Sequence, residues 1–281
     1  MAGTLQSCEV LVLGASGKLG GMLCRLWRPE GWRLVPVVRR DRGLPGALTW
    51  EPGFPPPDLH GVKAIVALWG VTPGAGRNLS DNARLAKAAV DLGASLKAET
   101  IVHCSSGAVY RPTAGPVPET TPADPQSAYG VAKREMEEVI EATREAGGAR
   151  QIVLRIGNVA GADSLFANLH RGGRVVLDDF GHHDGPSRSY IAPQDLARVI
   201  EALIRDPGAQ GIFNVAAPRP TRMADLGRAG GATISWRPAP DTAFPMMWLE
   251  TTRLSRHVRL PERSADADWL VAAAAEAGAF A

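Results

Sequence analysis

The chain has 281 residues, 45% of them hydrophobic and 21% charged, and its formal net charge is +2. This composition is that of an ordinary globular protein, and the small charge gives no reason to expect a nucleic-acid or membrane partner. The three cysteines form no C-x-x-C pair, so neither a disulfide framework nor a metal site is predicted.

The chain opens without the pattern of a signal peptide, and no long apolar window follows, so a cytoplasmic location is expected. Short apolar runs typical of buried strands then alternate with segments of helical periodicity. Strands are expected at 9–14, 33–40, 64–70, 100–106, 149–159 and 211–216. Helices are expected at 19–31, 78–94, 127–146 and 192–207. The alternation predicts an α/β fold with a doubly wound parallel sheet.

Two segments, 161–188 and 218–281, break this rhythm and are richer in Gly, Pro, Asp, Arg and His. We expect them to fold together as a small C-terminal substrate lobe over the carboxyl edge of the sheet, where doubly wound folds bind ligands. Residues 1–160 and 189–217 would then form the sheet domain.

A glycine-rich turn, VLVLGASGKLGGML, joins the first predicted strand to the first predicted helix. Its G-x-x-G-x-x-G spacing favours dinucleotide binding, with one glycine for the turn, one for the pyrophosphate and one for helix packing. The helix N-terminus would face the phosphates. The residues expected to bind the cofactor here are Gly14, Ser16, Gly17, Lys18, Leu19 and Gly20. The sheet domain is therefore predicted to be an NAD(P)-binding domain of the Rossmann type.

The second predicted strand ends in VVRRD, which bears on the choice between NAD and NADP. An acidic residue at this point binds the adenosine ribose diol, whereas a basic residue accommodates a 2′-phosphate. Val38 takes the expected acidic position and Arg39 and Arg40 follow, so the sequence favours NADP. Asp41 lies close enough to keep NAD as the alternative.

The stretch SAYGVAKREMEEVIEA places Tyr129 and Lys133 four residues apart at a helix start, hence on one face. A phenol has a pKa of about 10, which a nearby cation lowers. Ser105 and Ser106 end the preceding strand, where a hydroxyl can hold a carbonyl or alcohol oxygen. The pattern predicts Tyr129 as a general acid–base and Lys133 as its activating cation.

Four motifs, GASGKLG, SSGAVY, YGVAK and RIGNVAG, occur in this order. Together they resemble the extended short-chain dehydrogenase/reductase family, in its NAD(P)-dependent epimerase/dehydratase branch. The resemblance continues through 58–70, 78–90, 189–203 and 211–226. It implies an enzyme that moves a hydride between nicotinamide and a carbonyl or secondary alcohol carbon of a small, possibly sugar-type, substrate. A non-catalytic NADP sensor or scaffold on the same fold is the alternative.

The resemblance also implies roles for single residues. Ser106 matches the catalytic hydroxyl with Ser105 beside it, and Lys133 also grips the nicotinamide ribose. Asn78 matches a structural or proton-relay asparagine, with Asn82 as a rival one turn later. Further residues implied at the cofactor or substrate are Leu68, Trp69, Gly70, Asn158, Val159 and Arg188. For Arg188, a substrate anion and an ion pair with nearby acids are equally compatible partners.

Departures from the family pattern reduce the number of reaction types to expect. Gly107 and Ala108 stand where the sugar-nucleotide dehydratases of the family carry Asp-Glu, so dehydration is disfavoured. Trp69 replaces a small residue and is expected to crowd the cofactor, and the substrate lobe is short for a nucleotide-diphosphate sugar. Epimerase, reductase and dehydrogenase chemistry remain. The expected partners are a small-molecule substrate and a second copy of the chain, through the helices at 78–94 and 127–146.

Overall fold

The computed structural model describes residues 8–41, 43–144, 148–169, 173–181 and 183–280. Residues 1–7 of the stretch read for a signal peptide, and the last two residues of the helix expected at 127–146, lie outside them. The chain divides into two compact units. The first unit comprises Met1–Val109, Pro125–Leu154 and Leu203–Ile212, and the second comprises Tyr110–Asp124, Arg155–Ala202 and Phe213–Ala281.

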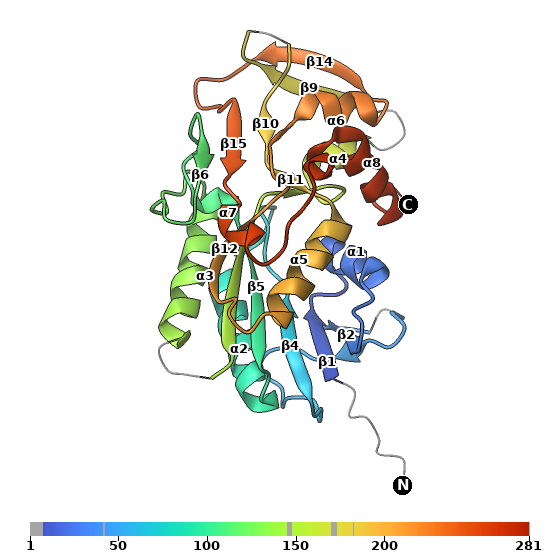
Figure 1. The fold of residues 1–281 in the computed structure, drawn as a ribbon, viewed down its shortest axis with the longest axis vertical. Coiled ribbons are helices and arrows are strands. Elements are labelled where there is room, and N and C mark those ends of the chain that lie inside the picture. The colour runs from blue at the N-terminus through green and yellow to red at the C-terminus, as the bar shows by residue number, and fades with distance from the viewer. Residues whose placement is uncertain (1–7, 42, 145–147, 170–172, 182, 281) are drawn as a thin grey trace. The chain divides into compact units, whose positions relative to one another are not determined.

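The main sheet has seven strands in the order β12-β7-β5-β4-β1-β2-β3 (Figure 1). Its strands are β1 (Cys8–Leu13), β2 (Trp32–Val38), β3 (Leu48–Thr49), β4 (Val62–Ala67), β5 (Thr100–Ser106), β7 (Arg150–Ile156) and β12 (Gly211–Val215). The pairings of β1 with β2 and β4, of β2 with β3 and of β4 with β5 are parallel. Because the chain winds outward from β1 in both directions, the sheet is doubly wound, and the predicted fold class is confirmed.

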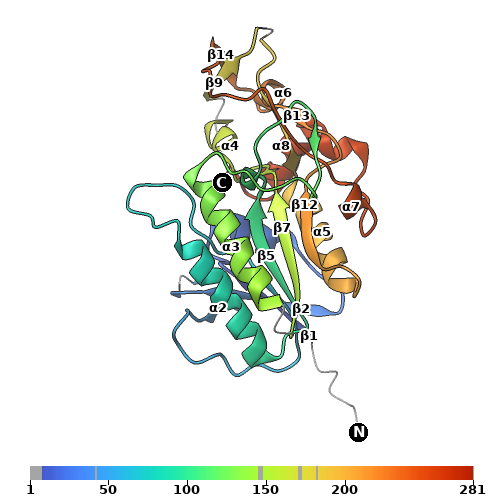
Figure 2. The same ribbon diagram turned by 90° about the vertical axis from the view of Figure 1, so that its left-hand side faces the viewer.

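Three helices belong to the first unit: α1 (Lys18–Leu26), α2 (Asp81–Leu96) and α3 (Ala128–Arg144). Helices α2 and α3 lie side by side against one face of the sheet (Figure 2). Leu92 of α2 packs on Ile65 and Ile101 of the strands in one buried cluster. A covered strand needs no polar face, which is why these strands read as continuous apolar runs in the sequence.

Local details differ from the expected elements in the first helix and the second strand. Helix α1 ends at Leu26 because Trp27 already has extended dihedrals, so it is shorter than the expected 19–31. Pro36 lies inside β2, but β3 pairs with β2 only at Val37 and Val38. Pro36 therefore occupies a part of β2 whose outer edge has no partner strand, where a missing N–H is tolerated.

The second unit combines short strands with helices around its own core. Its strands are β6 (Pro116–Val117), β8 (Asn158–Val159), β9 (Arg174–Asp179), β10 (Ser187–Arg188), β11 (Tyr190–Ile191), β13 (Thr221–Arg222), β14 (Thr233–Pro238) and β15 (Met246–Leu249). Its helices are α4 (Ser164–Leu169), α5 (Pro193–Arg205, which ends in the first unit), α6 (Met223–Ala229), α7 (Thr252–Ser255), α8 (Ala267–Glu276) and the 3-10 turn η2 (Glu262–Ala265). Phe166, Tyr190 and Leu270 are among the buried side chains of the core. Across the described part of the chain, no helix has the length and apolar character that crossing a membrane requires.

The units differ from the predicted domains at 110–124, 155–160, 189–202 and 213–217, which the structure groups with the second unit. Backbone hydrogen bonds explain the difference for two of these segments. The N–H groups of Asn158 and Ala160 donate to the carbonyls of Ser189 and Ile191. The predicted substrate lobe, 161–188 with 218–281, lies wholly within the second unit.

Candidate functional site

The glycine turn between β1 and α1 leaves no room for side chains at its first and third glycines. Gly14 has a φ of +81°, and a Cβ added there would lie 2.7 Å from the backbone nitrogen of Trp69. A Cβ at Gly20 would lie 2.3 Å from the Gly14 oxygen, so helix and turn are in direct backbone contact. Gly17 begins the helix without a side-chain cap, and no acidic residue occupies the first turn. The helix N-terminus is thus open to an anion.

A hollow of about 200 Å³ beside this turn is lined by Ser16, Arg39, Arg40 and Glu51. It brings two guanidinium groups and one carboxylate together, which are the groups that bind a 2′-phosphate and a ribose diol respectively. Sequence reasoning missed Glu51. It follows a strand of only two residues, β3, whose pattern is too short to locate the end of a strand.

The ring of Trp69 is directed at Trp50. The two rings stack with centroids 5.9 Å apart and planes 28° from parallel, and both pack on the apolar cluster of the sheet and α2. The indole N–H of Trp69 is buried with no hydrogen-bond partner among the described residues. The Trp69 backbone, with its Cβ, is the part that lies against Gly14. The predicted crowding of the cofactor by Trp69 stays a prediction.

Tyr129 and Ser106 meet where β5 ends and α3 begins. The Ser106 oxygen accepts the Ala108 N–H at 3.1 Å, and its hydroxyl hydrogen-bonds the phenol of Tyr129. A Cβ at Gly130 would lie 2.2 Å from the Ala108 oxygen, so only glycine lets α3 start this close to the strand end. Both hydroxyl-bearing side chains remain partly exposed, so a small molecule could reach them.

Lys133 lies beneath this pair and is 3% exposed. Its Nζ donates to the Cys104 carbonyl at 2.8 Å and lies 5.7 Å from the centroid of the Tyr129 ring. Burial lowers the pKa of the Lys133 ammonium, while Cys104 and Glu137 act in the opposite direction. The predicted proximity of Tyr129 and Lys133 is therefore present in the structure.

The pKa of Tyr129 is raised above its ordinary value, whereas the Tyr–Lys spacing predicted a lowered one. Burial of the phenol is the main cause, the Cys104 thiol adds to it, and the hydrogen bond from Ser106 opposes both. Desolvation thus decides the direction of the shift. In the protein alone Tyr129 is therefore protonated at neutral pH.

Ser105 faces the protein interior. Its side chain is buried, and its hydroxyl donates to Glu137 Oε1 at 2.6 Å. Successive residues of a strand point to opposite faces, so only one of the two serines can face the site. The predicted substrate-binding role of Ser105 is corrected accordingly. Glu137 was missed by sequence reasoning, although its place four residues after Lys133 on one helix was a usable signal.

Asn82, the rival of Asn78, is the buried amide of helix α2. Its Oδ1 accepts the Val71 N–H at 3.1 Å, and its Nδ2 donates to the carbonyls of Val71 at 2.9 Å and Leu79 at 2.8 Å. A Cβ at Gly70 would lie 3.0 Å from this Oδ1 and 3.4 Å from the Lys133 ammonium. Asn78 is exposed and bonds Ser80. The buried, hydrogen-bonded Asn82 therefore fits the predicted structural asparagine better than Asn78 does. Gly70 lies close to both the Asn82 amide and the Lys133 ammonium.

The remaining strand-end residue of the first unit, Leu68, anchors the end of β4. Its N–H donates to the Leu13 carbonyl at 3.0 Å. This bond holds the end of β4 beside the end of β1, so Leu68, Trp69 and Gly70 follow directly beside the glycine turn.

Asn158 and Val159 form β8 of the second unit. The Asn158 amide donates to Asp163 Oδ2 at 2.8 Å, and the same oxygen accepts the Tyr190 hydroxyl at 2.6 Å. Because a carboxylate only accepts, this contact orients the amide with its nitrogen toward Asp163. Val159 is buried. The predicted cofactor and substrate contacts of both residues stay predictions.

Arg188 lies on β10 of the second unit and donates to the backbone carbonyls of Ser187 at 2.8 Å and Phe244 at 3.0 Å. Burial lowers the pKa of its guanidinium. Within the described residues Arg188 forms no ion pair, and Asp178, whose charge acts on the guanidinium, is itself paired with Arg237. A guanidinium has five N–H donors, so these two bonds leave capacity for an anion, and that predicted role stays a prediction.

His103, inside β5, is an interior residue. Its Nε2 is 2.8 Å from Gln151 Oε1, and burial lowers its pKa to about 4. His103 is therefore neutral at physiological pH, and its ring N–H donates a hydrogen bond to the amide oxygen of Gln151. The described ranges of the chain contain no group of three or more His, Cys, Asp or Glu side chains placed to hold a metal ion.

Comparison with known proteins supplies the family. The model of the NAD dependent epimerase/dehydratase family matches residues 59–216, more than half of the chain. The UDP-glucose 4-epimerase of Azospirillum brasilense is 40% identical over 75 residues, which are 26% of this chain and 22% of that enzyme. This match therefore spans only about a fifth of the relative's length.

Two solved structures share the fold over nearly the whole chain. The NAD-dependent NDP-hexosamine 5,6-dehydratase TunA of tunicamycin biosynthesis has a TM-score of 0.77 at 18% identity, covering 97% of this chain and 98% of that one. The UDP-N-acetylglucosamine 4-epimerase of Bacillus cereus has a TM-score of 0.74 at 17% identity, covering 95% and 99%. At these identities the likeness shows the fold. Because the family model matches more than half of the chain, the chain belongs to the NAD-dependent epimerase/dehydratase family of extended short-chain dehydrogenases/reductases.

Proposed function

We propose that the protein is an NAD-dependent epimerase or oxidoreductase that acts at a secondary alcohol carbon of a nucleotide sugar, with Tyr129 as acid–base. The hydrogen-bonded pair of Tyr129 and Ser106, partly exposed at the end of β5, carries this proposal. Both groups can address one substrate oxygen, and the buried ammonium of Lys133 lies 5.7 Å from the phenol ring.

The residues of the first unit fit a dinucleotide. The backbone contact of Gly14 and Gly20 and the uncapped start of α1 supply the geometry that a pyrophosphate needs. The hollow lined by Ser16, Arg39, Arg40 and Glu51 would hold the adenosine end. The nicotinamide, when bound, supplies the site that accepts and returns a hydride.

The choice of NAD over NADP revises the preference drawn from the sequence. The family model is NAD dependent, the Thermus thermophilus UDP-glucose 4-epimerase was solved with NAD, and Glu51 offers a carboxylate to a ribose diol. Arg39 and Arg40 in the same hollow keep NADP as the second candidate. The ratio of NAD to NADP affinities tests this preference. Glu51→Gln should weaken NAD binding. A wild-type protein that binds NADP more tightly than NAD, and loses NADP binding in Arg39→Ala, would overturn the preference for NAD.

The chain's own residues divide the proton chemistry between them. Tyr129, protonated in the protein alone, gives its proton to a carbonyl oxygen, and in the reverse direction takes it back. Ser106 holds that oxygen, and the Ala108 N–H fixes the direction of the serine hydroxyl. Lys133, held at the Cys104 carbonyl, favours the phenolate once it forms.

The substrate class rests on the relatives. The Azospirillum enzyme is a UDP-glucose 4-epimerase, and a structural neighbour was solved with UDP-glucose and NAD. Gly107 and Ala108 carry no group that transfers a proton, so an elimination would lack its acid and base at these positions. Epimerisation or oxidation is therefore proposed ahead of dehydration. The cytoplasmic location and the homodimer stay predictions.

Incubation of the full chain with NAD and a panel of UDP-sugars, followed by NMR for epimers and by absorbance for NADH, tests the proposal. Tyr129→Phe should lower turnover by about 10²–10⁴-fold and leave dinucleotide affinity unchanged. Turnover that survives this change contradicts the assignment of the acid–base. Dinucleotide binding without turnover of any sugar would favour the non-catalytic sensor.

A further inference from the structure

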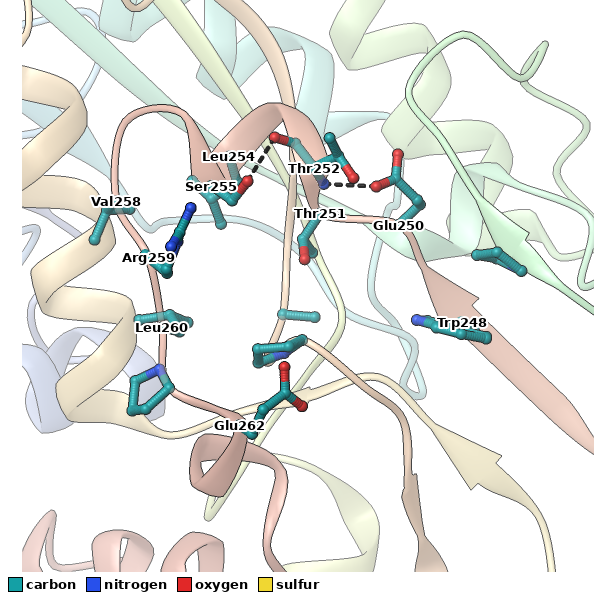
Figure 3. Close-up of a pocket in the computed structure, with 14 residues that line it drawn as sticks. Trp248, Glu250, Thr251, Thr252, Leu254, Ser255, Val258, Arg259, Leu260 and Glu262 are labelled. Carbon is teal, nitrogen blue, oxygen red and sulfur yellow. Dashed lines mark hydrogen bonds between the residues drawn. The ribbon is translucent and has the colours of Figure 1, made fainter.

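The second unit contains a pocket that none of the residues discussed so far lines. Its volume is about 650 Å³, within the range of about 300–1,000 Å³ typical of small-molecule sites. Figure 3 shows its wall, which runs from Trp248 at the end of β15 through helix α7 to Glu262 at the start of η2. Pro116 of β6 and the loop after β12 complete it.

Three polar side chains of this pocket make no contact that the fold needs. Within the described residues, the side chains of Trp248, Arg259 and Glu262 form no hydrogen bond or ion pair. Glu250 is held by one carboxylate oxygen, which accepts the Thr252 N–H at 2.6 Å. That contact orients the side chain and leaves its second oxygen without a partner in the described structure.

Figure 3 shows how these groups converge. The hydroxyl of Thr251, the ring of Trp248 and the carboxylate of Glu262 lie around one open space, with Arg259 on the opposite side. Leu254 and Leu260 are buried behind the wall. The pocket therefore offers a flat aromatic face, hydrogen-bond acceptors and hydrogen-bond donors around an apolar base.

The charge of the lining selects among ligands. The lining residues include two carboxylates, Glu250 and Glu262, and one guanidinium, Arg259, and so carry one net negative charge. A phosphate or carboxylate ligand would meet this charge unfavourably, whereas an ammonium group gains from the carboxylates and from the indole face. A diamine would leave the donors of Arg259 and Trp248 without acceptors, but sugar hydroxyls accept from both.

We propose that this pocket is a binding site for an amine-bearing, polyhydroxylated small molecule of the hexosamine class. The ammonium pairs with the carboxylate of Glu262, the hydroxyls bond Thr251 and Arg259, and the apolar C–H face of the ring rests on Trp248. The site is built from other residues than the glycine turn and the Tyr129 pair, so it does not depend on the reaction proposed above.

Titration of the full chain with glucosamine, glucose and glucose 6-phosphate, followed by saturation-transfer NMR and calorimetry, tests the site. We expect saturable glucosamine binding with a Kd on the order of 1 mM for a ligand of this size. Glucose should bind at least tenfold more weakly, and glucose 6-phosphate more weakly still. Equal binding of glucose and glucosamine, tighter binding of the phosphate, or no saturable binding each overturns the proposal.

Matched variants locate the binding. Glu262→Gln removes a charge from an exposed side chain that makes no contact to lose, so the fold is kept and glucosamine affinity should fall at least fivefold. Trp248→Ala should abolish binding. Glu135→Gln, at an exposed position of α3 outside the pocket, is the control and should leave affinity unchanged. Glucosamine binding that is the same in Glu262→Gln and the wild type excludes this pocket.

Discussion

Two adjacent glycines in helix α1 provide a test of the turn that needs no substrate. Gly20 and Gly21 share one helix, so a change to alanine gives each the same gain in helix propensity, about 0.5–1 kcal/mol. Their surroundings differ. A Cβ at Gly21 meets only the Ala15 oxygen at 3.8 Å, an ordinary contact, whereas a Cβ at Gly20 would lie 2.3 Å from the Gly14 oxygen and 2.8 Å from the Ala15 Cα.

The expected free energies of unfolding follow from these contacts. Gly21→Ala should stabilise the protein by about 0.5–1 kcal/mol. At Gly20 the obstructing atoms are backbone and cannot rotate away, so overpacking costs about 1–3 kcal/mol or more and reverses the gain. Because the propensity gain is common to both, the two variants should differ by the overpacking cost, about 1–3 kcal/mol or more, which corresponds to a Tm difference of about 2–12 °C at about 2–4 °C per kcal/mol.

Urea and thermal denaturation of both variants measure the difference, and titration with NAD measures its consequence for binding. Gly20→Ala pushes the helix off the turn, so dinucleotide affinity should fall at least tenfold, while Gly21→Ala should bind as the wild type does. Equal stability of the two variants, or a Gly20→Ala protein more stable than the wild type, would refute the close packing of helix and turn.

Asn82→Ala removes an amide that joins backbone groups of two segments and should lower the free energy of unfolding by about 1–3 kcal/mol. Asn78→Ala, at an exposed helix entrance, should lower it by less than about 1 kcal/mol. Equal losses of the two variants in urea denaturation would contradict the assignment of Asn82 as the structural asparagine. Glu137→Gln removes a charge that supports the buried ammonium on its own helix, so the pKa of that lysine, followed by NMR, should fall, and Glu138→Gln on the exposed face should leave it unchanged. His103 has a pKa of about 4 in the folded protein against 6.5 when unfolded. The unfolded state therefore binds more protons between these values, and the free energy of unfolding should fall by about 3 kcal/mol as the pH drops from 6.5 to 4. A His103→Phe variant that loses stability over the same window to the same extent would refute this origin.

Features encoded within one element could be predicted from the sequence. Strand β5 spans Thr100–Ser106, the same residues as its apolar run, because a buried parallel strand needs a continuous apolar stretch wherever it lies. Tyr129 and Lys133 share a helix face because helical spacing alone determines it. The glycine spacing predicted a tight turn and a closely packed helix because that motif performs the same task wherever it joins a strand to a helix.

Features that depend on contacts between distant segments were decided only by the tertiary structure. Which of Ser105 and Ser106 faces the site follows from the placement of Glu137 on another element. The direction of the Tyr129 pKa shift follows from burial, which sums over neighbours from the whole fold.

Glu51 joins Arg39 and Arg40 in one hollow because β3 lies beside β2, a pairing of only two residues that leaves no periodic trace in the sequence. The sequence thus determined the fold class, the glycine turn and the Tyr–Lys pair. Packing decided which neighbouring side chains complete the site and what charge they carry.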